Sequence, residues 1–264
     1  TASRQAADSA RSTPEIGASR AFATCTLPLR DFKAVAAACE ATINDLLLAT
    51  CSGALRQYLA GHHELPKRSL VAAVPLSLRE SGESAAGNQV TMLPCPLGTD
   101  QKTPRARLAA IQAGMNKVKG TKSSFRDLIP TDYPSLGSPW LMTGLAQLYA
   151  RSRLADRIPL PANLVISNVP GPPVTLYLAG ARMTTYFPVS IVVHGLALNI
   201  TVHSYDGKLH LGLIACRKNV PDLPKLVAAL YESFDELKAM AASELSAATP
   251  RPGARPAAKR RKPR

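Results

Sequence analysis

The sequence predicts a mixed α/β (α+β) fold, in which packed helices cover a mixed, mostly antiparallel sheet. Three observations lead to this prediction. Helical and strand-like segments intermix along the chain without an internal repeat. Hydrophobic residues make up 46% of the 264 residues, enough for a sizeable core. The Asp-Gly pair in "SYDGKL" indicates a tight hairpin, because it suits the positive φ angles of a type I′ turn.

Two consecutive helices are expected near the start of the folded part. The first covers about residues 29–39. The second begins near Thr42 or Asn44, either of which could supply its N-cap, and ends at about residue 60, before Gly61. Its apolar side chains recur at helical spacing, at Leu47, Leu48, Cys51, Leu55 and Leu59.

Two strands follow these helices. Residues 69–79 are nearly all apolar, which is typical of a strand buried on both faces. Residues 88–98 form the second strand, and Pro94 and Pro96 indicate that it is broken or lies at an edge of the sheet.

The middle of the chain predicts two more helices. Residues 103–120 are amphipathic, with Thr103 as a candidate cap, Pro104 in the first turn and Gly120 at the end. A proline-interrupted stretch then leads into a helix over about residues 140–155.

The last third of the chain predicts a run of strands and a long closing helix. The strands are expected over residues 162–169, 174–180, 181–195, 196–207 and 208–217. The helix is expected over about residues 219–245, with Asp222 as a candidate cap. Its apolar stripe comprises Leu223, Leu226, Leu230 and Phe234.

Composition divides the chain into three parts. Residues 1–23 read as a polar linker without the apolar core of a secretory signal, residues 24–247 as one folded domain, and residues 248–264 as a disordered basic tail. The seven Lys and Arg residues of the tail account for half of the net charge of +14. A basic surface favours anionic partners, so the tail either solubilises the protein, contacts a membrane surface or, least in keeping with the rest of the chain, binds nucleic acid.

Other counts exclude several classes of protein. The five cysteines are odd in number and form no CxxC pair, which predicts a reduced, cytoplasmic protein with no disulfide framework and no metal site. Aromatic residues make up only 5%, too few for the stacking surface that single-stranded nucleic acid needs. The chain has neither an apolar run long enough to span a membrane nor a GxSxG or phosphate-loop motif, and no bound cofactor is expected.

The only adjacent histidines, His62 and His63, are the first candidate for a general base. They lie in a polar connection after a helix, where the cations Lys67 and Arg68 would lower the histidine pKa and only Glu64 could orient a ring. A solvated loop is the better interpretation.

Polar side chains on two further segments leave alternatives open. Strand alternation puts Asn199, Thr201 and His203 on one face, which is either solvated or lines a cleft. Asn44 and Asp45 either cap the helix that follows or use its positive N-terminal end to stabilise negative charge.

The stretch "NLVISNVPGPPVTLYLAGARMT" reads locally as strand, turn and strand. Pro170 and Gly171 suit the central positions of a type II turn, in which the glycine would take a positive φ.

Several segments resemble the bacterial wax ester synthase/diacylglycerol acyltransferases. "SNVPGPPVTLYLAGARM", "YFPVSIVVHGLALNITVHSYDGKLHLGLIACR" and "VPDLPKLVAAL" resemble the C-terminal half of that family. Earlier in the chain, "INDLLLATCSGALRQYL" resembles its Asn-Asp helix, "LVAAVPLSLR" the next strand and "GNQVTMLPCPL" its Gly-Asn strand. The resemblance extends from about Thr24 to Leu237 and keeps the family's order.

This resemblance implies one half of a chloramphenicol-acetyltransferase-like, two-domain fold with the active site in a tunnel between the halves. It implies transfer of an acyl group from acyl-CoA to diacylglycerol or a long-chain (fatty) alcohol. In that family the second histidine of an HHxxxDG motif in the N-terminal half deprotonates the acceptor hydroxyl.

The chain lacks that motif. Lys67 and Arg68 stand at its Asp and Gly positions after His62 and His63, and the pair follows the Asn-Asp helix, whereas the family's motif precedes it. We therefore expect a C-terminal half, inactive alone, whose partners are acyl-CoA, the lipid acceptor, an N-terminal half with HHxxxDG and, peripherally, a membrane or lipid surface. The alternative is a non-catalytic lipid-surface binding module. In either case we expect a cytoplasmic protein that lies peripherally at the inner membrane or on lipid droplets.

The resemblance also implies site residues. Asn44 would donate a hydrogen bond to the developing oxyanion or fix the catalytic histidine, and Asp45 would hold the local backbone. A second group would shape the site or bind substrate: Ser167, Asn168, Pro170, Gly171, Pro172, His194 and Asn199.

Overall fold

The computed structural model describes residues 16–77, 90–120, 162–172, 174–193 and 195–248. The helix predicted over residues 140–155, His194, residues 1–15 of the predicted linker and all of the predicted tail after Ala248 lie outside the described residues.

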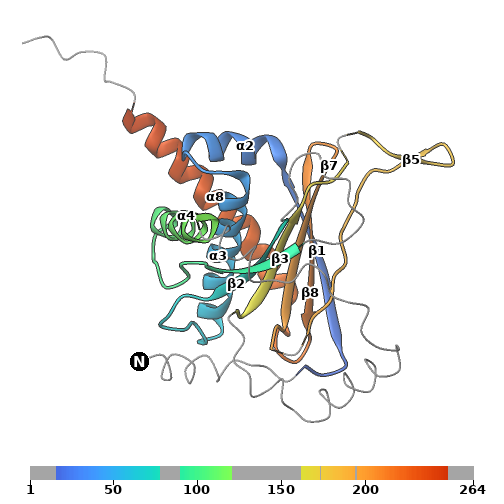
Figure 1. The fold of residues 1–264 in the computed structure, drawn as a ribbon, viewed down its shortest axis with the longest axis horizontal. Helices are drawn as coiled ribbons and strands as arrows, with labels where there is room; N and C mark the ends of the chain where they lie inside the picture. The colour runs from blue at the N-terminus through green and yellow to red at the C-terminus, as the bar shows by residue number, and fades with distance from the viewer. Residues whose placement is uncertain (1–15, 78–89, 121–161, 173, 194, 249–264) are drawn as a thin grey trace, which may run out of the picture.

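The centre of the molecule is a six-stranded sheet (Figure 1). In sheet order its strands are β1 (Arg20–Pro28), β8 (Lys208–Cys216), β7 (Leu198–Tyr205), β4 (Leu164–Val169), β2 (Val71–Ser77) and β3 (Val90–Pro96). β4 runs parallel to both β2 and β7, and the other neighbouring strands are antiparallel. The predicted mixed, mostly antiparallel sheet is confirmed.

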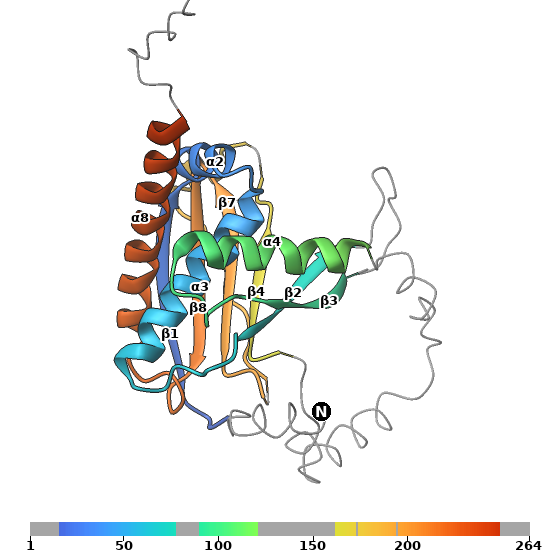
Figure 2. The ribbon, with the colours of Figure 1, turned by 90° about the vertical axis from the view of Figure 1, so that its left-hand side faces the viewer.

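Four helices of the described chain lie on one side of this sheet (Figures 1 and 2). They are α2 (Leu29–Ala38), α3 (Ile43–Gly61), α4 (Pro104–Gly120) and α8 (Leu223–Ala248). The opposite side carries no described helix, and we call it the helix-free face. A small hairpin of β5 (Tyr177–Leu178) and β6 (Ala181–Arg182) projects from the molecule (Figure 1).

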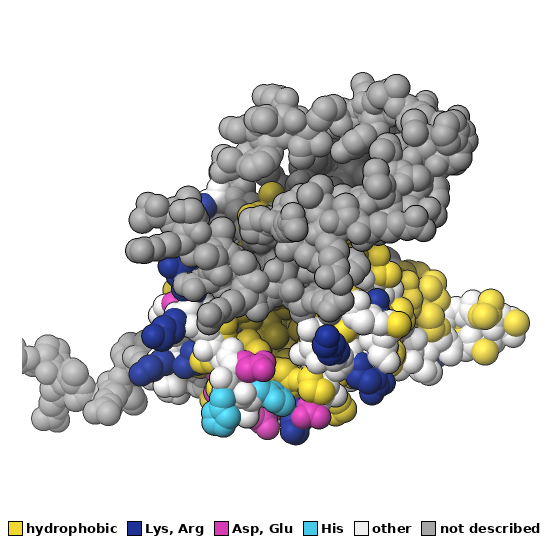
Figure 3. Space-filling view, turned by 90° about the horizontal axis from the view of Figure 1, so that it is seen from below, with side chains coloured by type: hydrophobic (Ala, Val, Ile, Leu, Met, Phe, Trp, Pro, Cys, Tyr) yellow, Lys and Arg dark blue, Asp and Glu magenta, His cyan; other side chains and the backbone are white. Residues whose placement is uncertain are grey.

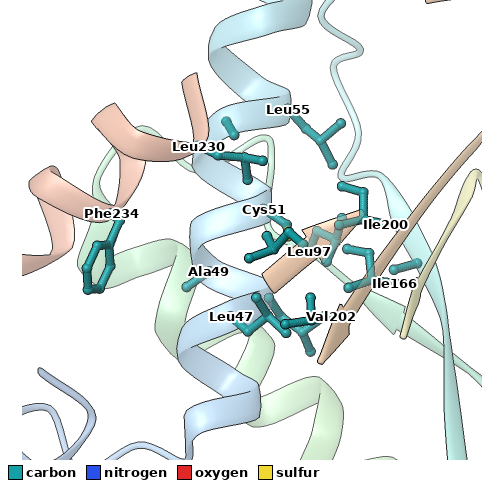
Figure 4. Close-up of a cluster of buried hydrophobic side chains, with 14 of the residues drawn as sticks. Leu47, Ala49, Cys51, Leu55, Leu97, Ile166, Ile200, Val202, Leu230 and Phe234 are labelled. Carbon is teal, nitrogen blue, oxygen red and sulfur yellow. The ribbon is translucent and has the colours of Figure 1, made fainter. Parts of the chain in front are cut away.

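The core fills the space between the sheet and the helices. Leu47, Cys51 and Leu55 of α3 lie beside Ile166 and Ile200 of the sheet (Figure 4). On the outer side of the helix layer, Phe32 of α2 stacks on Phe234 of α8 with 4.3 Å between ring centroids. Each large apolar side chain buried in this way contributes about 1.5–3 kcal/mol to folding, so α3 is fixed firmly against the sheet.

Several predicted features are confirmed. β3 is an edge strand, as its two prolines indicate. Asp206 and Gly207 both have positive φ, 47° and 74°, as the Asp-Gly hairpin signal requires. Thr103 Oγ1 accepts a hydrogen bond from the Ala106 N–H at 3.3 Å, so this threonine caps α4.

Two predictions differ from the structure at the level of elements. β1 begins at Arg20, inside the stretch assigned to the linker, and was not predicted as a strand; it pairs along its whole length with β8. The strand predicted over residues 181–195 is wrong beyond Arg182, because the chain there leaves the β5–β6 hairpin and lies across the sheet instead of joining it.

No single helix among the described residues has the length and apolar character needed to cross a membrane. α2 and α3 reach that measure only when taken together, and they meet at an angle of 99°.

Candidate functional site

Every second side chain of the central strands points to the helix-free face. Register places Ser167 beside Thr201 and Thr201 beside Gly212, so these three form one row across β4, β7 and β8. The residues between them point the other way, into the core under the helices, as Ile200 and Val202 do. The period-two pattern of polar residues on β7 therefore marks this face.

Residues 186–193, which we call the strap, cross the helix-free face. The Tyr186 ring lies 4.9 Å from the His203 ring, and the Phe187 ring meets His210 edge-on at 5.2 Å. At Gly212 the strap is so close that a Cβ would collide with the carbonyl oxygen of Pro188. Glycine is therefore required in the middle of β8 to seat the strap.

Asn199 joins the sheet to the strap. Its Nδ2 donates hydrogen bonds to Ser190 Oγ at 3.0 Å and to the Ile191 carbonyl at 3.1 Å. Its Oδ1 accepts a hydrogen bond from Thr201 Oγ1 at 2.8 Å. Only 6% of Asn199 is exposed, so its polar atoms serve these partners and not solvent.

An open groove of about 580 Å³ lies between the strap and the sheet. Its polar lining comes from Ser167, Asn199, Thr201 and His203. Its apolar lining includes Pro75, Met92, Val165, Val189, Ile191 and Leu196. A mostly apolar channel with a few polar groups on its floor is typical of a site for a small, largely hydrocarbon ligand.

Two histidines lie beneath the strap. Burial lowers the pKa of His203, and burial together with the nearby Lys208 lowers the pKa of His210. His203 Nδ1 and His210 Nε2 are buried and meet no hydrogen-bond partner among the described residues. His210 Nδ1 lies 3.3 Å from Thr26 Oγ1. The rings are therefore neutral at physiological pH and pack against the strap.

The predicted turn at Pro170 and Gly171 is wrong in its geometry. Gly171 is not among the glycines with positive φ in the described chain, so it does not occupy the third position of a type II turn. A Cβ on Gly171 would collide with the Ser204 carbonyl, and its N–H donates to Ser204 Oγ at 3.2 Å. Glycine is needed because the segment of Pro170 and Pro172 passes directly over the end of β7.

Asp45 closes a capping box at the start of α3. The Thr42 hydroxyl accepts a hydrogen bond from the Asp45 N–H at 3.1 Å. The Asp45 carboxylate accepts from the Thr42 N–H at 3.1 Å and from the Thr42 hydroxyl at 2.7 Å. Asp45 thus holds the local backbone, and Thr42, not Asn44, is the cap.

Asn44 and Asn168 are not among the residues that line the groove. Asn168 pairs in register with Val202, whose side chain is in the core, so alternation directs Asn168 to the helix side. Figure 4 shows Leu47, in the turn after Asn44, beside Val202. The structure therefore brings Ser167 and Asn199 together in the groove, and places Asn168 near the end of β4 and Asn44 in the first turn of α3.

The adjacent histidines lie on the helix side of the molecule. The His62 ring packs on Tyr58 at 4.6 Å, and its Nε2 is 3.9 Å from the Asp222 carboxylate at the start of α8. His62 and His63 are therefore remote from the groove, as their interpretation as a connection implies.

The cysteines behave as buried small hydrophobes. All five are free and buried. Burial raises the pKa of Cys51 to about 12 and the pKa of Cys25 and Cys95 to about 11, so these thiols stay protonated at neutral pH and are not nucleophiles. Within the described ranges no three His, Cys, Asp or Glu side chains gather as metal ligands.

Sequence reasoning missed the strap and its contacts. Tyr186, Phe187 and Ser190 were not candidates, because their segment was predicted to be a strand. Gly212, inside an apolar strand, was the available signal of a close backbone approach.

Comparison with known proteins gives a consistent result. Residues 86–238 match the family model described as the WS/DGAT C-terminal domain. The chain is 39% identical, over 225 residues, to a putative diacylglycerol O-acyltransferase of Mycobacterium tuberculosis H37Rv, covering 85% of this chain and 45% of that protein. It is 38% identical, over 229 residues, to the O-acyltransferase WSD of Acinetobacter baylyi, covering 87% and 48%.

A solved structure shows the same fold. The wax ester synthase/diacylglycerol acyltransferase from Marinobacter aquaeolei VT8 matches with a TM-score of 0.67 at 29% identity, over 91% of this chain and 57% of that one. The chain thus spans about half the length of the curated relatives it matches.

Proposed function

Because the chain belongs to the WS/DGAT C-terminal domain family, we propose that it is the C-terminal half of an acyl-CoA-dependent O-acyltransferase that acylates diacylglycerol or a long-chain alcohol. The observation that carries this proposal is the apolar groove on the helix-free face. It offers a hydrocarbon chain a lined channel, and the two histidines beneath the strap, His203 and His210, are packed against it and not arranged as a general base.

The base would come from a second domain that carries HHxxxDG and packs on the helix-free face. Large apolar side chains are unusually exposed on this side, including Phe22 at 50%, Met92 at 52%, and Val189 and Ile191 at 71% each. The projecting β5–β6 hairpin adds Tyr177 and Leu178, and Figure 3 shows hydrophobic side chains at its end. Exposed apolar surface of this extent marks a contact with another protein surface or a lipid.

In the proposed reaction the histidine of the second domain takes the proton of the acceptor hydroxyl. The oxygen attacks the thioester carbonyl, a C–O bond forms, the C–S bond breaks, and CoA leaves as its thiol after receiving that proton. This chain contributes binding and orientation.

The test joins the first half of the Acinetobacter O-acyltransferase to this chain and assays ester formation from palmitoyl-CoA with hexadecanol or a diacylglycerol. The relative rebuilt with its own second half through the same junction is the positive control. We expect ester from the joined protein, none from this chain alone, and none when the second histidine of HHxxxDG is replaced by alanine. A joined protein that folds cooperatively and makes no ester while the control does would contradict the proposal, as would ester from this chain alone.

We also propose that the protein works at the surface of the inner membrane or of lipid droplets. Its net charge of +14 favours anionic head groups, and its proposed acceptors reside in such phases. A lipid-surface binding module without catalysis would share this property, and the ester assay separates the two functions.

A further inference from the structure

Both polar atoms of the Asn199 side chain make hydrogen bonds on the helix-free face. All three of its described hydrogen bonds hold the strap or fix the amide that holds it. The Ile191 carbonyl requires a donor, so Nδ2 must face the strap. The Thr201 hydroxyl, which donates to Oδ1, stabilises that orientation of the amide.

The strap has few other attachments to the sheet. The described residues 183–192 belong to no strand, and an isolated bridge between Val193 and Leu196 closes their end. The other described contacts of this segment are a hydrogen bond that Tyr205 Oη of β7 donates to the Met183 carbonyl at 2.9 Å, ring packing of Tyr186 and Phe187, and the seat of Pro188 on Gly212. The directional bonds to residues 190 and 191 therefore come from Asn199.

Ser190 and Ile191, the two strap residues that Asn199 binds, lie at the apolar wall of the groove. Val189 and Ile191 flank Ser190, line the groove, and are each 71% exposed. Because Asn199 binds the Ser190 hydroxyl and the Ile191 carbonyl, a shift of the strap at this point would widen the groove along its apolar side.

We infer that Asn199 is a positioning residue: it fixes the strap, and with it the outer wall of a groove that receives a hydrocarbon chain of the lipid substrate. This inference rests on the proposed function. The acyl chain of the CoA thioester and the chain of the alcohol share this chemistry, and the experiment distinguishes them. Each methylene buried in the groove changes affinity about fourfold, so a displaced wall alters binding more than chemistry.

The first measurement needs no activity. Hydrogen exchange of the strap amides is compared between the unmodified chain, Asn199→Asp, Ser190→Ala and Thr201→Val. Aspartate keeps the shape and the acceptor for Thr201 but cannot donate to the strap. We expect exchange in residues 186–193 to rise about thirtyfold in Asn199→Asp, which loses two hydrogen bonds of about 1 kcal/mol each, and about fivefold in the other two variants, which each lose one. Exchange in α3 and β8 stays unchanged.

Two matched controls accompany these variants. Asn116→Asp makes the same chemical change at an exposed position on α4, and Thr201→Ser keeps the hydroxyl. Neither should alter strap exchange. If Asn199→Asp fails to fold, Ser190→Ala and Thr201→Val each remove a single bond and carry the test. Strap exchange that is unchanged in the folded variants overturns the inference.

The second measurement uses the joined protein of the ester assay. Acyl-CoA donors from octanoyl to stearoyl are tested at fixed alcohol, and alcohols from octanol to octadecanol at fixed donor. We expect Asn199→Asp to raise KM for the long members of one series about five- to tenfold, with kcat within about twofold. The series that responds identifies the chain in the groove.

A fall in kcat at unchanged KM, or equal effects at all chain lengths, overturns the inference. The two proposals fail differently. No ester from the unmodified joined protein refutes the proposed function and leaves the exchange result standing, whereas ester formation with an indifferent Asn199 refutes the positioning role alone.

Discussion

At the scale of single residues, close backbone approach explains the glycines that shape the site. Gly171 passes over the Ser204 carbonyl, and Gly212 lies under the Pro188 carbonyl. Both contacts join segments far apart in the sequence. The local pattern at Pro170 therefore predicts a turn, and the packing reason for the glycine is visible only in three dimensions.

Gly212→Ala should destabilise the protein by about 1–3 kcal/mol, because the new methyl group must displace the strap or bend β8. Urea unfolding measures this loss. Gly61→Ala is the control, since a Cβ there meets nothing within 4 Å and lies at the end of a helix, where alanine is favourable. A Gly212→Ala protein as stable as the control would show that the strap does not rest on β8.

His203 and His210 should make folding stability depend on pH. Burial lowers their pKa below the usual 6.5, so in that range the unfolded chain binds more protons than the folded chain. The neutral rings therefore contribute fully to the free energy of unfolding above pH 6.5. This contribution decreases as the pH falls from 6.5 toward the lower pKa of the folded state. Urea midpoints at pH 7.5 and pH 5.5 should differ, and His210→Gln should reduce the difference.

His63→Gln, in the exposed turn after α3, controls for loss of a histidine as such. A His210→Gln protein with the same pH dependence as the unmodified chain would contradict this account. Among the charged groups near His210, Lys208 lowers its pKa further and Asp206 opposes that effect.

At the scale of elements, two ion pairs join α4 to α8, one made by a buried arginine and one by an exposed arginine. Arg107, 3% exposed, lies 2.8 Å from Glu236 and donates to the Lys102 carbonyl at 3.0 Å. Arg105 lies 3.5 Å from Glu244, with both side chains more than a third exposed. The same two helices thus carry a matched comparison of burial.

Arg107→Ala should cost about 2 kcal/mol of stability, since it removes charge-assisted hydrogen bonds and packing from between three helices. Arg105→Ala should cost less than about 0.5 kcal/mol, because solvent screens an exposed pair. Thermal or urea unfolding of both variants checks this. Equal losses of stability in the two variants would mean that the burial of Arg107 does not stabilise the packing of α4.

The elements also show how far sequence patterns reach. The α3 and α8 periodicities, the edge position of β3 and the Asp-Gly hairpin depend on local signals and are predictable. β1 was missed because it follows a polar, Ala/Ser-rich stretch, and its strand character comes from pairing with β8. The strap resembles a strand in composition, yet its Val189 and Ile191 are largely exposed, on a segment that lies on top of the sheet.

The candidate site was predictable in part for the same reason. Alternation on β7 placed Asn199, Thr201 and His203 on one face and left open whether it lines a cleft. The resemblance pointed to Ser167 and Asn199, which meet in the groove. Tyr186 and Ser190 depend on the path of the strap, which no local pattern specifies. The roles of Asn44 and His194 in a reaction stay predictions.

At the scale of the whole molecule, two faces have different properties. One side of the sheet is closed by helices, and the other exposes a groove and apolar side chains. The charge is also uneven, since half of the net +14 belongs to the final seventeen residues. We therefore propose that the apolar face contacts a second domain and that the positive charge contacts a lipid surface.

Binding to vesicles that contain anionic lipid should weaken as salt is raised, because ions screen the attraction. Co-sedimentation at low and high sodium chloride measures the bound fraction. A chain truncated after Ala248 keeps half of the net charge, so it should bind less and with a weaker salt dependence, and zwitterionic vesicles should bind little of either protein. Binding that is strong and insensitive to salt would contradict the electrostatic part of the proposal.

The central claim is that the helix-free face contributes to acyl transfer once a histidine-bearing half covers it. The most direct test compares wax ester formed by the joined protein carrying Ile191→Glu with that of the protein carrying Leu245→Glu. Both positions are largely exposed, at 71% and 57%, but Ile191 lines the groove and Leu245 lies on α8. The account predicts a loss of at least about tenfold for Ile191→Glu, because a charge would be buried without a partner, and unchanged ester for Leu245→Glu. Equal activity of the two variants would contradict it.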